Sequence, residues 1–204
     1  MKKILLVPFK KQSLSYSCFP SAVNMVLRFY GDAIDEKKLY REAVIPGGKG
    51  TWDVKIAPFL IKKGYKVTTF WSGKIGEWGY GPKLIRKYRK VYSEALKHGM
   101  RHRQDASIDL IKSFIDKGIP SLAEVSADKF YRRKMGVSHI LVVVGYSNKY
   151  LFIHDPDIEF GGKFKKVSIN RFRRAWEKIA PVSGWDISPS AGRSMTVIEP
   201  LSRL

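Results

Sequence analysis

Apolar residues recur at helical spacing through the first part of the chain and alternate at strand spacing through most of the second part. Together with the glycines that can end a helix, this pattern predicts helices over residues 18–30, 37–43, 52–63 and 108–117. It also predicts a basic helix that begins at Pro82 and a short helix over 171–179. Alternating β-branched and aromatic residues predict strands over 65–71, 120–126, 139–146, 149–155, 164–169 and 194–199. Helices that precede a mostly antiparallel sheet indicate an α+β fold.

Turn and capping residues set the expected boundaries of these elements. Thr51 and Asn170 are expected to cap the helices that follow them, and Ser107 the helix over 108–117. The glycine-rich segment 72–82 and the segment 127–137 are expected to be loops. The sequence shows no repeat or linker, so we expect a single domain over residues 1–204 with a basic helical insertion at about 72–104.

The first predicted helix begins at the only cysteine of the chain, Cys18. Ser15 or Ser17 can cap this helix, Pro20 is tolerated in its first turn, and Gly31 ends it. A helix N-terminus favours an anion, and the thiolate is the nucleophilic form of a cysteine. Cys18 is therefore a candidate nucleophile; the alternative is a small buried hydrophobic residue.

A second informative stretch, residues 138–156, reads as a β-hairpin. If the strands turn at Ser147–Asn148, His139 lies directly across from Asp155, and the imidazole and the carboxylate can form a hydrogen bond. A slip of one residue would place His154 there instead and turn Asp155 away. The alternatives are a strand-edge histidine and an aspartate that begins an Asp-Pro turn.

Cysteine, histidine and aspartate have complementary roles in acyl transfer. The imidazole takes the thiol proton, the carboxylate orients the imidazole, and the thiolate attacks a carbonyl carbon to form an acyl-enzyme. The oxyanion then needs donors, which the side-chain amide of Gln12 and the backbone N–H of Cys18 can supply. Gln12 could otherwise be an ordinary exposed polar residue.

These residues carry a resemblance to a known family. Gln-x5-Cys at a helix start, a distant histidine that opens a strand, and an Asp-Pro that ends the next strand resemble the papain-like cysteine peptidases, and among them the C39-like family, relatives of the double-glycine leader peptidases of bacteriocin exporters. The resemblance covers most of the chain. It implies a papain-like fold with Cys18 as nucleophile, His139 as base, Asp155 as its orienting residue and Gln12 as oxyanion donor.

The chain departs from the family pattern at several places. Phe19 follows the cysteine where members often have glycine, and Phe19-Pro20 would narrow the cleft. The insertion at 72–104 is longer than the family needs, and no transporter accompanies the sequence, so a role coupled to an exporter is not carried over.

A net charge of +20 is the most unusual bulk property. It favours an acidic peptide or protein substrate, or an anionic partner such as nucleic acid or a membrane surface. The residues expected to form the basic patches are Lys83, Arg86, Lys87, Arg89 and Lys90 in the basic helix and Arg132 and Arg133 beside the sheet.

Other features narrow the class of protein. One cysteine excludes a disulfide framework and a multi-cysteine metal site. His98 and His102 have the spacing of a helical metal pair but lack a nearby third ligand, so we expect no metal and no cofactor. The short apolar N-terminus is followed by lysines, and no segment resembles a membrane span, which favours a cytoplasmic protein.

The leading interpretation is a hydrolase that cleaves a peptide or amide bond through an acyl-Cys18 intermediate. An acyltransferase would use the same intermediate with an amine in place of water. The alternative from another class is a catalytically silent papain-like module, either a scaffold or one that binds nucleic acid or an anionic membrane, with Tyr88 and Tyr92 interleaved among the basic residues.

Overall fold

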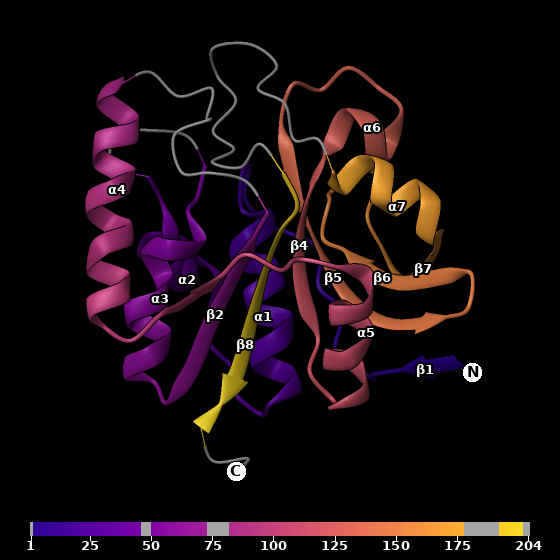
Figure 1. Cartoon of the computed structure of the whole chain (residues 1–204), viewed down its shortest axis with the longest axis horizontal. Helices are drawn as coiled ribbons and strands as arrows, with labels where there is room; N and C mark the ends of the chain where they lie inside the picture. The colour runs from indigo at the N-terminus through magenta and orange to yellow at the C-terminus, as the bar shows by residue number, and fades with distance from the viewer. Residues whose placement is uncertain (1, 46–49, 73–81, 178–191, 202–204) are drawn as a thin grey trace.

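The computed structural model describes residues 2–45, 50–72, 82–177 and 192–201 and contains helices packed around one twisted sheet (Figure 1). The helices are α1 (Cys18–Phe29), α2 (Glu36–Ala43), α3 (Asp53–Lys62), α4 (Pro82–Lys97), α5 (Ile108–Asp116), α6 (Ala127–Tyr131) and α7 (Ile169–Trp176). The strands are β1 (Lys2–Ile4), β2 (Tyr65–Trp71), β3 (Arg101–Arg103), β4 (Ser121–Ser126), β5 (Ser138–Ser147), β6 (Tyr150–Asp155), β7 (Gly162–Ser168) and β8 (Ser194–Pro200). This is the predicted α+β arrangement.

The strands form one sheet in the order β3-β2-β8-β4-β5-β6-β7, with β1 paired to β5. All pairs are antiparallel except β2 with β3. Strand β8 lies between β2 and β4 and so joins the part of the sheet near the N-terminal helices to the hairpins of the second part. The mostly antiparallel sheet confirms the prediction.

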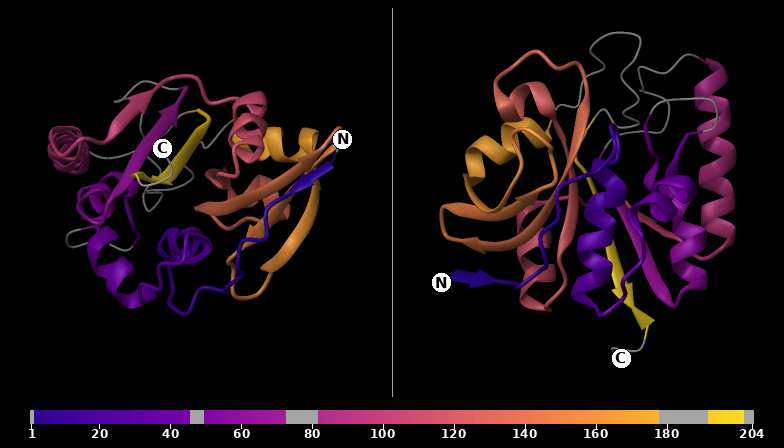
Figure 2. Two further views of the ribbon diagram at one scale, coloured as in Figure 1. Left: turned by 90° about the horizontal axis from the view of Figure 1, so that it is seen from below. Right: turned by 180° about the vertical axis from the view of Figure 1, so that it is seen from behind.

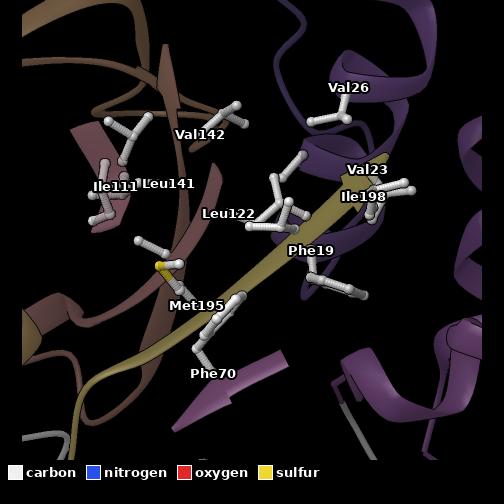
Figure 3. Close-up of a cluster of buried hydrophobic side chains, with 14 of the residues drawn as sticks. Phe19, Val23, Val26, Phe70, Ile111, Leu122, Leu141, Val142, Met195 and Ile198 are labelled. Atoms are coloured by element: carbon white, nitrogen blue, oxygen red, sulfur yellow. The ribbon is translucent and has the colours of Figure 1, made fainter. Parts of the chain in front are cut away.

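Helix α1 lies on one face of the sheet and α5 on the other (Figures 1 and 2). Every residue of α1 from Phe19 to Leu27 is buried, which explains its almost wholly apolar sequence. Phe19, Val23 and Val26 pack toward apolar side chains of the sheet (Figure 3). Burying side chains of this size contributes about 2 kcal/mol each and holds the start of α1 rigidly.

The side chain of Phe19 points into this core, 3% exposed. Figure 3 shows it beside β8, in the same cluster as Phe70 and Ile198. The expectation that Phe19 narrows a cleft was therefore wrong. The second residue of α1 faces the sheet, and an apolar ring at this position is buried in the core.

Several predicted boundaries were displaced because backbone geometry overrides local capping preference. Asp53 begins α3, whereas Thr51 forms a bridge with Val44. Ser168 caps α7 through its side chain, so Asn170 is not the cap. The prediction of Ser107 as a cap is confirmed, since its side chain accepts a hydrogen bond from the N–H of Leu110.

The sequence pattern missed the shortest elements. Strands β1 and β3 are too short to show alternation, and α6 lies inside the predicted loop 127–137. Helix α4 ends at Lys97, ahead of Gly99 at φ +98°, so His98 and His102 do not share a helix. Most of the expected loop 72–82 lies outside the described residues, as do the last residues of the predicted helix 171–179.

None of the helices in the described ranges has both the length and the apolar character needed to cross a bilayer.

Candidate active site

Cys18 is the first residue of α1 and is partly exposed, while its neighbours Ser17 and Phe19 are buried. Cys18 is therefore carried on a rigid helix and is itself only partly buried. Ser17 is the N-cap residue by position, yet its hydroxyl makes no capping hydrogen bond to the helix. The predicted place of Cys18 at a helix N-terminus is confirmed.

His139 and Asp155 form a buried hydrogen-bonded pair. The Nε2 atom of His139 lies 2.9 Å from Oδ1 of Asp155. His139 is the second residue of β5 and Asp155 is the last of β6, so adjacent strands of one sheet hold both groups. The ring of Tyr131 packs against the imidazole with 5.7 Å between ring centroids.

The strand register that makes this pair differs from the predicted one. The strands turn at residues 148–149, a bulge follows between Val143 and Gly145, and Val142 then lies opposite His154. If this register is continued, Asp155 faces Leu141 and is diagonal to His139. The predicted register is therefore shifted by two residues. Because successive side chains of a strand point to opposite faces of the sheet, an even shift leaves His139 and Asp155 on the same face.

His154 points away from this pair. Its Nε2 lies 2.8 Å from the carbonyl oxygen of Val7, and its Nδ1 accepts a hydrogen bond from the N–H of Phe164 at 3.0 Å. Burial lowers the pKa of His154, which favours the neutral ring that these two bonds require. His154 therefore fastens the N-terminal segment to the sheet.

The electrostatics of His139 connect it to Cys18. Burial opposes the charged imidazolium, but the hydrogen bond with Asp155 and the hydrogen bond and charge of Cys18 outweigh it and raise the pKa of His139 to about 10. Since Nε2 is engaged by Asp155, Nδ1 is the ring nitrogen that can serve Cys18. The structure thus brings together the candidate nucleophile, base and orienting carboxylate.

Asp155 has further partners that the sequence interpretation missed. The hydroxyl of Tyr131 donates to both carboxylate oxygens at 2.9 and 3.0 Å, and Nζ of Lys165 lies 2.7 Å from Oδ2. Burial alone would raise the pKa of Asp155, but the bonds and charges of His139 and Lys165 lower it to about 2. The carboxylate is therefore ionised throughout the physiological range.

Gln12 is fixed next to this group through its backbone. Its N–H donates to the carbonyl oxygen of Pro156 at 2.8 Å, directly after Asp155 in sequence. Its side-chain amide donates to the carbonyl oxygen of Leu14 at 3.2 Å, and that contact needs only one of the two amide N–H groups. The other amide N–H is the candidate oxyanion donor.

A buried carboxylate organises the segment that leads from Gln12 to Cys18. Oε1 of Glu36 accepts hydrogen bonds from the N–H of Ser13 at 3.0 Å and from the hydroxyls of Ser17 and Ser21 at 2.8 and 2.7 Å. Lys10 lies 3.1 Å from Oε2. Burial acts in the opposite direction, but these partners lower the pKa of Glu36 to about 2. No short motif in the sequence signals this role, because the partners converge only in the fold.

The predicted basic residues lie on the surface in two separate places. The five in α4 (Lys83, Arg86, Lys87, Arg89 and Lys90) are exposed at one end of the molecule, while Arg132 and Arg133 are exposed after α6, well away from α4 (Figure 1). Tyr88 is fully buried and Tyr92 stacks on Trp71, so neither ring forms a platform among the basic residues. Spacing of four residues places both rings on the packed side of α4, so their interleaving with basic residues in the sequence gives the binding alternative no aromatic platform.

Among the described residues there is no cluster of three or more histidine, cysteine or acidic side chains that could hold a metal ion.

Comparison with known proteins identifies the family. The model of the Peptidase_C39 like family matches residues 4–183 of the chain. The chain belongs to this family. No curated protein sequence gives a significant match. Because the matched range includes the segments that carry Cys18, His139 and Asp155, membership in the C39-like family agrees with the resemblance inferred from the sequence.

Two solved structures establish the fold of this C39-like protein. The peptidase domain of Streptococcus ComA, a bifunctional ABC transporter involved in quorum sensing, is 16% identical, with a TM-score of 0.57 over 95% of this chain and 98% of that domain. A double glycine motif protease from an AMS/PCAT transporter, solved with its leader peptide, is 14% identical, with a TM-score of 0.54 over 97% of this chain and 94% of that one. The family is one of cysteine peptidases, and the two structures show the fold that this chain shares with them.

Proposed function

We propose that this C39-like chain is an active peptidase that cleaves a peptide or amide bond through an acyl-Cys18 intermediate. The observation that carries the proposal is the placement of His139, which is hydrogen-bonded to Asp155 on one side and interacts with Cys18 on the other. A buried histidine between a carboxylate and a thiol is the arrangement needed to generate a thiolate. A structural histidine would need only one of these partners.

The proposed reaction begins with proton transfer from the thiol of Cys18 to Nδ1 of His139. The thiolate attacks the carbonyl carbon, and the oxyanion accepts hydrogen bonds from the side-chain amide of Gln12 and the N–H of Cys18. His139 then returns its proton to the leaving amine as the C–N bond breaks, which leaves an acyl thioester on Cys18. Water, deprotonated by His139, hydrolyses the thioester and restores the thiol.

The proposed substrate is a peptide. One of the similar structures is a protease in complex with a leader peptide, which supports a peptide ligand for the same fold. The net charge of +20 would attract an acidic peptide or protein toward the molecule. The basic residues of α4 are exposed, but Tyr88 is buried, so α4 offers nucleic acid positive charge without a ring of Tyr88 on which bases could stack.

The test is to incubate wild type and Cys18→Ala with a diverse peptide library and to read the products by mass spectrometry. We expect new peptide termini with wild type alone, and a thioester adduct on Cys18 that hydroxylamine removes. Identical libraries after treatment with either protein, together with a thiol no more reactive than free cysteine at pH 6, would contradict the proposal.

A further inference from the structure

The carboxylate of Asp155 is divided between two cationic groups. Oδ1 accepts from Nε2 of His139 at 2.9 Å and from the N–H of Asp157 at 3.2 Å, while Oδ2 accepts from Nζ of Lys165 at 2.7 Å. Asp155 is fully buried, whereas the side chain of Lys165 is 32% exposed. The lysine thus reaches the carboxylate from the solvent side.

The sheet explains how Lys165 arrives there. Lys165 lies on β7 directly opposite Ile153 of β6, and Asp155 is two residues further along β6, on the same face. A register irregularity between Ile153 and Asp155 and the left-handed backbone of Phe164 at φ +51° occur at this point. The ammonium also donates to the carbonyl oxygen of Phe160 at 2.7 Å, so it is held in one place.

We propose that Lys165 is a positioning residue of the active site, which acts through Asp155. By occupying Oδ2 with a fixed positive charge, Lys165 leaves a single oxygen, Oδ1, to His139 and limits how strongly the carboxylate retains the proton of the imidazolium. Tyr131, which donates to both oxygens, keeps the carboxylate oriented. A triad of cysteine, histidine and aspartate does not by itself require this lysine.

This inference rests on the proposed function, because the tuning matters only if His139 must give its proton to a leaving amine. An imidazolium that faces an unshared, buried carboxylate would hold its proton too strongly to be an effective acid. A lysine close to the carboxylate partly cancels that attraction. Lys165 would therefore favour the second half of the acylation step.

Other ionisable groups also lie close to His139 and Asp155. Cys18 faces His139 from α1, and Tyr131 on α6 and Asp157 after β6 face Asp155. Arg171 on α7 bonds the carbonyl oxygen of Phe130 and does not contact the carboxylate. Replacing Cys18 with serine removes the ionisable thiol, so that the charge varied in the experiment is that of Lys165.

The experiment is a titration of the His139 ring by NMR in the Cys18→Ser protein, with His139→Gln to assign the signal. Adding Lys165→Met should move the midpoint of His139 to higher pH by about one pH unit, because the full charge of Asp155 then acts on the imidazolium. Lys165→Arg should restore the midpoint of the Cys18→Ser protein. Lys166→Met is the matched control, since Lys166 is the next residue of β7 but lies over the ring of Tyr150.

An unchanged midpoint in Lys165→Met would overturn the inference, and so would a lower one, which would mean that Asp155 turns away when the lysine is lost. If Lys165→Met does not fold, as judged by near-UV circular dichroism, Lys165→Gln replaces it. Because the titration is made without the thiol, its result is independent of catalysis. Failure of the proposed function would appear separately, as an unreactive Cys18 in the wild-type chain.

Discussion

The backbone N–H of Gln12 donates to the carbonyl oxygen of Pro156 at 2.8 Å, which ties the segment entering α1 to the residue that follows Asp155. This bond uses no side-chain atom of Gln12. A substitution at Gln12 can therefore remove the candidate oxyanion donor while this backbone link to Pro156 stays in place. The catalytic contribution of the side-chain amide can therefore be measured in a protein that keeps the backbone hydrogen bond.

Gln12→Ala is expected to lower the rate of acylation by a peptide substrate by about 10²- to 10³-fold, as for other oxyanion donors. Alkylation of Cys18 by iodoacetamide develops no oxyanion, so its rate should be unchanged. Both rates are measured by intact mass on the same protein. Equal losses in the two reactions would assign Gln12 a role in thiol placement.

His139→Ala is expected to slow alkylation of Cys18 at pH 6 by about 10²-fold or more, because an ordinary thiol is almost entirely protonated at that pH. Asp155→Asn should slow it less, since the imidazole remains. His154→Ala serves as the comparison, because His154 bonds Val7 and lies on the other face of the sheet. Rates that do not depend on His139 would make Cys18 a structural residue.

Glu36 is expected to make the fold sensitive to acid. Its pKa is lowered to about 2 in the folded protein from an ordinary 4.5, so its contribution is complete above pH 4.5 and is lost as pH falls toward 2. The contribution amounts to at most about 3 kcal/mol.

Urea unfolding at pH 3 and pH 6 measures this contribution. The difference in unfolding free energy between the two pH values should be smaller in Glu36→Gln than in wild type. Comparing the two proteins cancels the effect of Asp155, whose pKa is also lowered to about 2. An identical pH dependence in both proteins would show that the serine cluster does not depend on the charge.

Phe19→Ala is expected to destabilise the protein by about 3–5 kcal/mol, since it opens a cavity in a close-packed core. The alkylation rate of Cys18 in the folded fraction should stay near that of wild type, because the ring is buried in the core, among apolar side chains of the sheet. Urea unfolding and alkylation below the transition measure the two effects. A stable variant with altered reactivity would instead place the ring in the substrate cleft.

The sequence allowed the helix start at Cys18 and the shared face of His139 and Asp155 to be predicted, because both depend on local periodicity. The bulge in the hairpin at residues 143–145 could not be predicted, since no local pattern marks it. Lys165 and Glu36 were missed for a related reason. Their partners lie on other elements, and a charged residue in a strand or at a helix start usually faces solvent.

The position of β8 has a consequence for when the site can form during synthesis. Strand β8 is the last strand of the sheet in sequence, yet it lies in the middle, between β2 and β4. Before residues 194–200 have left the ribosome, β2 with β3 and the strands β4 to β7 are not joined into one sheet. Pairing between strands far apart in sequence forms slowly. The contacts that support the start of α1, including those of Phe19 beside β8, are therefore complete only after residues 194–200 have been added to the chain.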